Sequence, residues 1–348
     1  MSQSINLYKQ LASHRLFNKS VNFSLKRIKL ALNLLGSPER KLKNVISVIG
    51  ESGKFTTLFS LKSFIEANNQ TVTTHISPSL RDIKERFYMG KKYLTHKKIK
   101  ETIKQIEKLN IPLTVFECLT LVYVINASKI NAEYNIQETG ALWRLDSNNI
   151  NDFPLIQICT NINKQHLNFL KNKTLDEVIK EDVGFMSNFT SIYIGKQSPY
   201  VLKKIKSYLK NNASKITYPN SWKLIKKGQR YYYQDKKTKI KLKTKHVYSK
   251  GMFENVCLAI KVALDLNINK KTIQLQHTNG LTYDYLYNMA KDLHDKNQLM
   301  YMGAGVNGTD PLIFQLNGIP MRGFLEGRVD KTRYQLLLHL SNMEIKLP

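Results

Sequence analysis

The sequence predicts an α/β protein, in which a P-loop-like, doubly wound and mostly parallel sheet precedes a smaller C-terminal α+β unit. The β-branched run Val45–Ile49 leads directly into Gly50, a helical stretch follows at Thr56–Ala67, and Thr71–Ile76 has the composition of the next strand. Strand, glycine-rich turn, helix and strand in this order form the βαβ unit of a parallel sheet. From Ser221 onward the pattern changes to short alternating runs, which predicts an antiparallel part.

Apolar spacing predicts the remaining elements. Phe23–Leu35 has apolar side chains at helical spacing and is followed by Gly36, a residue that commonly ends helices. We further expect a helix at 95–109, a buried helix at 116–127, a strand at 155–159, strands at 222–225, 231–234 and 240–242 with a turn at 234–237, and helices at 253–266 and 283–296. The Tyr231–Tyr233 run is interpreted as a strand of mixed exposure rather than a base-stacking platform. The expected domains are 1–265, with a small antiparallel part at about 218–250, and an atypical short unit at 266–348.

Length and composition limit which classes of protein the chain can belong to. A chain of 348 residues is long enough for two domains. Its net charge of +28, densest between Lys203 and Lys245, fits either a nucleic-acid footprint or solvated faces that attract small polyanionic substrates. No zinc finger, helix-turn-helix or RNP motif accompanies the charge, so we do not expect a nucleic-acid partner and keep a basic nucleic-acid-binding protein only as an alternative. Cys118, Cys159 and Cys257 lie far apart without metal-ligand spacing, which predicts buried or free thiols.

The sequence gives no sign of a membrane partner. The longest apolar run, Ile111–Ala127, is interrupted by Glu117, Cys118 and Asn126, and a membrane span needs about 20 apolar residues. The N-terminus is polar where a secretory signal would be apolar. We therefore expect a cytoplasmic protein.

The segment Gly50–Thr56 is the candidate phosphate loop. It follows a strand and opens a helix, its glycines allow close approach of the backbone, and it offers Lys54 and the Thr56 hydroxyl. Its spacing departs from the GxxxxGK[ST] loop, because Thr56 stands two residues after the lysine. A second glycine-rich segment, Gly303–Gly308, has the formal GxGxxG pattern without a clear helix behind it, and we interpret it as a turn.

Short motifs follow one another in a characteristic order between about residues 22 and 265. They are LLGSPERKLKNVISVIGESGKFT from Leu34, HISPSL from His75, ER from Glu85, FE from Phe116, ETGALWRLDSNN from Glu138, QH from Gln165, FL from Phe169, TLDEVIKEDVGFM from Thr174, and the isolated Asn255. Together they resemble the folylpolyglutamate synthase/dihydrofolate synthase branch of the Mur ligase family. The resemblance implies the Mur ligase central-domain fold for the sheet.

The resemblance also implies a function. It implies an ATP- and Mg²⁺-dependent carbon–nitrogen ligase of folate biosynthesis and one-carbon metabolism, which adds glutamate to a folate or pteroate acceptor through an acyl phosphate, and we expect a monomer. The residues it implies are Lys54, Glu138 and His166 in catalysis, Gly50, Ser52, Gly53, Lys54, Thr56 and Asn255 for the nucleotide, and Thr56, Ser77, Glu138 and His166 for the metal. Taken alone, Glu138 is equally well a carboxylate at a strand end, and His166 a hydrogen-bonded polar histidine.

Several positions depart from the family pattern. Phe55 replaces a glycine in the phosphate loop, Ser79 a histidine, and Asp182 a lysine that some Mur ligases carbamylate to help bind magnesium. Ala141–Trp143 fills a segment that the family keeps glycine-rich, and Gln274–Asn279 lacks the aspartate of its closest counterpart. These departures keep a second reading open: a catalytically impaired or inactive protein of this fold that retains nucleotide binding.

Overall fold

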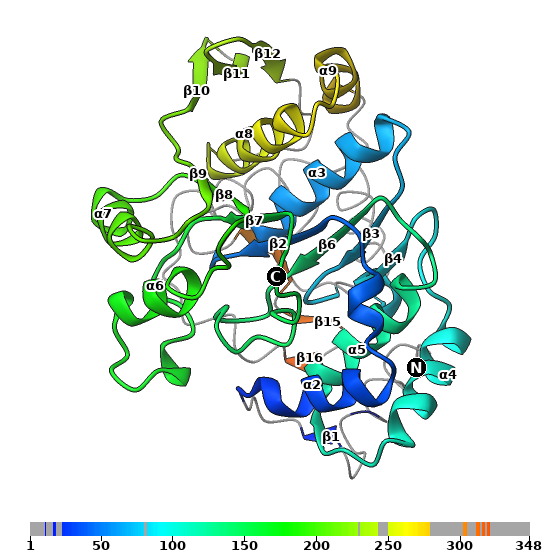
Figure 1. The fold of residues 1–348 in the computed structure, drawn as a ribbon. Helices are drawn as coiled ribbons and strands as arrows, with labels where there is room; N and C mark the ends of the chain where they lie inside the picture. The colour runs from blue at the N-terminus through cyan, green and yellow to red at the C-terminus, as the bar shows by residue number, and fades with distance from the viewer. Residues whose placement is uncertain are drawn as a thin grey trace. The chain divides into compact units, whose positions relative to one another are not determined.

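The computed structural model describes two compact units. The described residues are 11, 17–18, 23–79, 82–228, 230–242, 250–278, 302–304, 311–313, 315–316 and 319–320. The first unit comprises 1–50, 70–193 and 198–216, and the second comprises 51–69, 194–197 and 217–348. Figure 1 shows the elements of both units.

The first unit is built on a mostly parallel sheet (Figure 1). In the described part of the chain its strand order is β4-β3-β6-β2-β7-β8-β9. The strands are β2 (Val45–Ile49), β3 (Val72–His75), β4 (Phe87–Met89), β6 (Tyr134–Glu138), β7 (Ile156–Cys159), β8 (Ser191–Ile194) and β9 (Lys215–Thr217). Strands β3, β6, β2 and β7 pair in parallel, and β4 pairs antiparallel with β3. The expected mostly parallel α/β sheet is thereby confirmed.

Helix α5 (Val115–Ala127) is the centre of the first unit's core. It packs against α2 (Leu25–Leu34), α4 (His96–Glu107), β3 and β4. It is buried on all sides, as expected for the apolar run at this position. The other elements of this unit are β1 (Phe17–Asn18), which pairs in parallel with β5 (Leu113–Thr114), the helices α6 (Leu175–Val183) and α7 (Pro199–Tyr208), and the short 3₁₀ turns η1 (Pro38–Lys41), η2 (Ile83–Arg86) and η3 (Leu167–Phe169).

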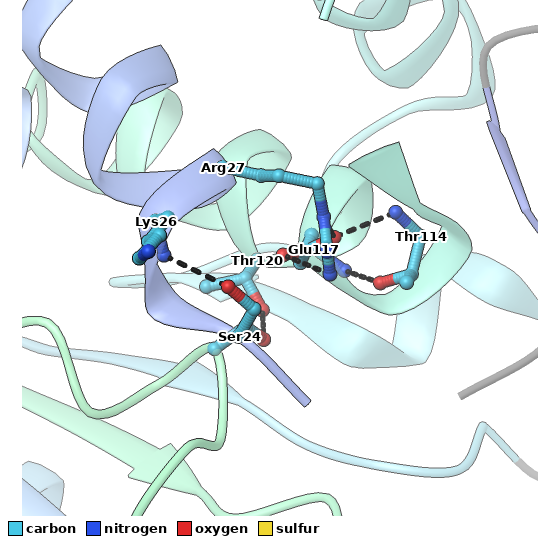
Figure 2. Close-up of polar contacts among 7 residues, drawn as sticks. Ser24, Lys26, Arg27, Thr114, Glu117 and Thr120 are labelled. Carbon is cyan, nitrogen blue, oxygen red and sulfur yellow. Dashed lines mark hydrogen bonds and ion pairs between the residues drawn. The ribbon is translucent and has the colours of Figure 1, made fainter. Parts of the chain in front are cut away.

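The start of α5 is fixed by a capping box (Figure 2). The Thr114 hydroxyl accepts the backbone N–H of Glu117, whose carboxylate accepts the backbone N–H of Thr114 at 2.6 Å. Two otherwise unsatisfied donors of the first turn are thus paired. Arg27 of α2 donates to both oxygens of the same carboxylate, at 3.0 and 3.2 Å, and so ties α2 to α5.

The second unit combines helices with a small antiparallel sheet (Figure 1). Helix α3 (Lys54–Ala67) packs on α8 (Lys250–Asp265) and α9 (Lys270–Thr278). The sheet consists of β10 (Trp222–Lys227), β11 (Arg230–Asp235) and β12 (Lys239–Leu242), and α8 and α9 pack against it. Further along the chain, β13 (Met302–Ala304) pairs with β14 (Pro311–Ile313), and β15 (Gln315–Leu316) pairs with β16 (Ile319–Pro320).

Most expected elements are present with small shifts at their ends. The helix expected at 56–67 begins two residues earlier, at Lys54, and the three antiparallel strands and their turn are confirmed. The sequence reasoning missed the strands β1, β4, β5, β6, β8 and β9 and the helices α6, α7 and α9. Gly303 and Ala304 lie in β13 instead of a turn, while the rest of that motif and the helix expected at 283–296 lie outside the described residues. The division at residue 265 stays a prediction; the two compact units follow a different division, since α3 packs with α8 and α9.

Two further expectations concern cysteines and membranes. The three cysteines are buried thiols outside any disulfide, as expected. Among the helices that the structure describes, none has the length and apolar character to cross a bilayer.

Candidate functional site

The loop between β2 and α3 requires glycine at two positions. Gly50 and Gly53 have φ angles of +113° and +93°, in the left-handed region that favours glycine. A Cβ atom on Gly50 would lie 2.7 Å from the Thr160 Oγ1, and one on Gly53 would lie 2.1 Å from the Asn255 Nδ2. The chain therefore approaches Thr160 and Asn255 so closely at these points that no side chain fits.

Helix α3 begins where this loop ends. Gly53 is the N-cap of this 14-residue helix and, having no side chain, contributes no side-chain hydrogen bond there. Such a helix start favours an anion. Lys54 is only 7% exposed, and its Nζ lies 3.4 Å from the Glu51 carbonyl oxygen, within the same loop. Thr56 is fully buried in the first turn.

Four candidate positions lie at the carboxyl ends of the parallel strands of the first unit. Gly50 follows β2, Ser77 follows β3, Glu138 ends β6 and Thr160 follows β7. Val48 pairs with Glu138 in register, so the carboxyl ends of these strands meet at one edge of the sheet. That edge is where open α/β sheets bind ligands.

Ser77 and Glu138 are brought together at this edge. The backbone N–H of Ser77 donates to the Glu138 Oε2 at 3.0 Å, and Glu138 is 3% exposed. These residues are two of the four predicted metal ligands, and this contact places them next to each other. Magnesium in phosphate-handling sites is commonly held by one or two carboxylates together with water and phosphate oxygens. Among the described residues, no three or more His, Cys, Asp or Glu side chains are grouped so that they could hold a metal ion.

A hydrogen-bond relay holds the backbone that carries Glu138. The Asn148 amide donates to the Glu138 carbonyl oxygen at 2.8 Å, and its Oδ1 lies 3.1 Å from the His75 Nδ1. Since the amide nitrogen is committed to Glu138, Oδ1 must accept, and the His75 Nδ1 carries the proton. Asp146 accepts the backbone N–H groups of Gly140 and Asn148, each at 2.9 Å, and so fixes the loop after β6.

His75 is held neutral in this relay. Its ring is fully buried and stacks with Phe87, Phe116 and Tyr123. Burial, followed by the positive charge of Arg86, lowers the pKa of His75 to about 3. The sequence reasoning missed this role, because His75 and Asn148 are far apart in the chain and only the fold joins them.

Two further residues singled out from the sequence, His166 and Asp182, also belong to the first unit. His166 is the N-cap of η3 and has a φ angle of +55°. Its side chain is half-buried and stacks on Phe169, with ring centroids 6.1 Å apart. Asp182, which stands in place of the family's lysine, is fully buried, and its Oδ1 accepts the backbone N–H of Trp143 at 3.2 Å. The Asp182 carboxylate thus binds the segment that departs from the glycine-rich family pattern.

The predicted residues fall into two groups, one in each unit. The first unit contains Gly50, Ser77, Glu138 and His166, and the second contains Ser52, Gly53, Lys54, Thr56 and Asn255. Within the second unit Asn255 of α8 lies against Gly53 and is 5% exposed. The two close groupings that the structure shows are therefore Ser77 with Glu138, and Gly53 with Lys54 and Asn255.

Comparison with known proteins identifies relatives by sequence. No family model matches the chain. A dihydrofolate synthase/folylpolyglutamate synthase of Bacillus subtilis (strain 168) is 27% identical over 199 residues, which are 55% of this chain and 46% of the relative. The protein of the same name from Buchnera aphidicola subsp. Schizaphis graminum is 32% identical over 156 residues, 44% of this chain and 37% of the relative. The chain thus spans about half the length, or less, of these curated relatives.

Solved structures show the same fold. Folylpolyglutamate synthase of Thermotoga maritima has a TM-score of 0.69 at 18% identity, over 79% of this chain and 65% of that one. The bifunctional folylpolyglutamate synthase/dihydrofolate synthase of Yersinia pestis CO92 has a TM-score of 0.68 at 21% identity, over 80% and 66%. The Mycobacterium tuberculosis enzyme, solved in complex with ADP and AMPPCP, has a TM-score of 0.68 at 17% identity, over 79% and 65%.

Proposed function

We propose that this chain, a divergent relative of the folylpolyglutamate synthase/dihydrofolate synthase branch of the Mur ligase family, catalyses ATP- and Mg²⁺-dependent addition of glutamate to a folate or pteroate acceptor. The observation that carries the proposal is the loop at Gly50–Lys54, which turns through two glycines with positive φ into the start of a 14-residue helix. A buried lysine at that start suits the phosphates of a nucleotide. The relatives' names supply the reaction class.

The chain's own residues bind, orient and neutralise charge. The N–H groups at the start of α3 and the Lys54 ammonium hold the β- and γ-phosphates, while Asn255 contacts the adenine. The acceptor carboxylate attacks the γ-phosphorus, ADP leaves, and the resulting acyl phosphate is attacked by the glutamate amine, which releases phosphate. Such chemistry depends mainly on positioning and on electrostatic stabilisation of the transferred phosphoryl group.

The residues present also fit a magnesium ion. Glu138 and Ser77 of the first unit supply a carboxylate and a hydroxyl oxygen at the strand ends, and His166 of the same unit would add an imidazole nitrogen. When bound, the ion neutralises charge on the transferred phosphate. The His75–Asn148 relay keeps the Glu138 backbone fixed without adding charge of its own, because His75 is neutral.

A ligation assay tests the proposal. The full chain is incubated with MgATP, glutamate and dihydropteroate, and the product is detected by mass spectrometry as the acceptor carrying one added glutamyl residue. We expect product from the unmutated chain, its loss in Glu138→Gln, and normal amounts in Glu101→Gln, since Glu101 is exposed on α4. Equal product from both variants, or none from the unmutated chain, would contradict the proposal.

A second candidate function is nucleotide binding without ligation. Asp182, which replaces a family lysine, binds the backbone of Trp143 in the structure. MgATP binding that is abolished by Lys54→Ala, together with no product for dihydropteroate or for tetrahydrofolate, would favour this candidate over the ligase.

A further inference from the structure

The antiparallel sheet of the second unit separates its side chains into two chemically different faces. Register places Leu224, Tyr233 and Ile240 side by side across β10, β11 and β12. Tyr233 and Ile240 are fully buried, and Tyr231, on the same face, stacks on Phe253 of α8 with ring centroids 4.0 Å apart. Because side chains alternate along a strand, the neighbours of these residues point the other way. We call the opposite side the outer face.

The outer face is basic in each of its rows. Lys223, Gln234 and Lys239 form one row, Ile225, Tyr232 and Lys241 the next, and Lys227 and Arg230 the third. Successive rows are about 6.8 Å apart, two residues at about 3.4 Å each. Lys223, Lys227, Arg230 and Lys239 are all exposed.

No carboxylate of the described strand residues balances these charges on the outer face. Asp235 is the only acidic residue of β10–β12, and register puts it opposite Trp222 on the packed side. There it accepts the Tyr233 hydroxyl at 2.7 Å and the backbone N–H groups of Lys237 and Thr238. The charged side chains that β10–β12 present on the outer face are therefore all cations.

An aromatic ring lies among these cations. Tyr232 is partly exposed, has Ile225 and Lys241 on either side, and carries the Lys239 Nζ 5.1 Å from its ring centroid. Its two neighbours in the tyrosine run face the packed side, so Tyr232 alone of the three can meet a ligand on the outer face. Proteins that bind single-stranded nucleic acid combine cations that contact the phosphates with aromatic rings on which bases stack, often on the face of a sheet.

We infer that the outer face of β10–β12 binds single-stranded nucleic acid, with Tyr232 as the stacking residue. This inference departs from the sequence-based expectations of no nucleic-acid partner and of a tyrosine run that is not a base-stacking platform, because the register separates Tyr232 from its two neighbours. An acidic protein would match the charge but has no need of a ring at the centre of the surface, and a duplex exposes no free base face for Tyr232. This inference does not depend on the proposed ligase activity, since none of its residues belongs to the nucleotide or metal groups described above.

The experiment measures fluorescence anisotropy of a labelled oligouridylate of about 12 nucleotides, within the range of single-strand site sizes, with the full chain over a series of salt concentrations. The charge variant is Lys223→Gln/Lys227→Gln/Lys239→Gln. Its matched control is Lys97→Gln/Lys100→Gln/Lys104→Gln, which removes the same charge from exposed positions of α4. The ring variants are Tyr232→Leu and Tyr232→Phe.

We expect the sheet triple variant to bind the oligonucleotide about tenfold more weakly or worse. The slope of the logarithm of the binding constant against the logarithm of the salt concentration should fall in magnitude by about 2, because each lost phosphate contact contributes about 0.7. The α4 triple should change affinity by less than about threefold, mainly through long-range charge screened by salt. Tyr232→Leu should weaken binding by about fivefold or more at an unchanged slope, and Tyr232→Phe should retain it.

Three outcomes would overturn the inference. The first is that the unmutated chain does not bind the oligonucleotide. The second is that the two triple variants weaken binding equally. The third is that a duplex or a polyglutamate peptide binds as tightly as the oligonucleotide and Tyr232→Leu has no effect. Far-UV circular dichroism of each variant verifies that the fold is retained, which is expected because all the substituted side chains are at least partly exposed.

Discussion

Replacing Gly53 by alanine tests the geometry of the phosphate loop most sharply. Gly53 has φ +93°, and an alanine Cβ there would lie 2.1, 2.5 and 2.7 Å from the Nδ2, Cγ and Oδ1 atoms of Asn255. The left-handed conformation costs alanine about 1–2 kcal/mol. Crowding in a packed region adds about 1–3 kcal/mol, because the Asn255 side chain must leave its position. We therefore expect Gly53→Ala to lower the free energy of unfolding by about 2–5 kcal/mol.

Gly228 provides the matched control in the same unit. It also has a positive φ, +56°, but a Cβ on it would meet nothing within 4 Å. Gly228→Ala should therefore show the conformational cost alone, about 1–2 kcal/mol. The difference between the two variants isolates the contact of Gly53 with Asn255.

A double-mutant cycle completes this test. Asn255→Ala removes the side chain that the new methyl group would meet, so Gly53→Ala should be less destabilising in that background by about 1–3 kcal/mol. Urea unfolding of the four chains, with equal m-values as the condition for comparison, measures the coupling. If Gly53→Ala costs no more than Gly228→Ala, or if Asn255→Ala restores nothing, the close approach of the loop to α8 is wrong.

Three further substitutions test the first unit. Arg27→Met should lower the free energy of unfolding by about 1–3 kcal/mol, since it leaves the buried carboxylate of Glu117 without its bidentate partner. The control is Arg40→Met, which should cost under about 0.5 kcal/mol because the Arg40 side chain is 82% exposed. Thermal unfolding measures both variants. Burial lowers the His75 pKa from 6.5 to about 3, so below pH 6.5 the unfolded chain takes up a proton that the folded chain does not, and stability falls as pH drops toward 3. In His75→Phe the unfolding midpoint should fall less steeply between those pH values, and an unchanged slope would refute the neutral buried histidine. Asn148→Ala should cost about 2–3 kcal/mol, because it leaves the Glu138 carbonyl oxygen and the His75 N–H without their partner, and a cost below about 0.5 kcal/mol would remove the relay from the account.

Regular patterns in the sequence were sufficient to predict part of the fold. The β-branched run of β2, the mostly apolar sequence of α5 and the alternating strands of β10–β12 are local patterns that predict the elements found in the structure. Strand β6 was missed because its buried residues include Asn135 and Gln137, so neither alternation nor an apolar run marks it. The Asn135 amide is accommodated by Thr73 and the Lys43 carbonyl oxygen, partners that only the folded sheet supplies.

In the candidate site, too, local sequence patterns predicted some features, and contacts between distant parts of the chain could not be predicted. Glycine spacing before a helix predicted the loop at Gly50–Lys54, and the left-handed φ angles of Gly50 and Gly53 explain why glycine is required there. The partners of these glycines, Thr160 and Asn255, are distant in the chain, and their close approach could not be derived from spacing. The relay from His75 through Asn148 to Glu138 likewise joins two strands and a loop that no local pattern connects.

Calorimetric titration with MgATP tests the central claim most directly. We expect the unmutated chain to bind with micromolar affinity, Lys54→Ala to lose that binding, and Lys91→Ala, an exposed lysine outside the loop, to retain it. Binding that is absent from the unmutated chain, or equal in all three proteins, would contradict the assignment of the Gly50–Lys54 loop as a phosphate site.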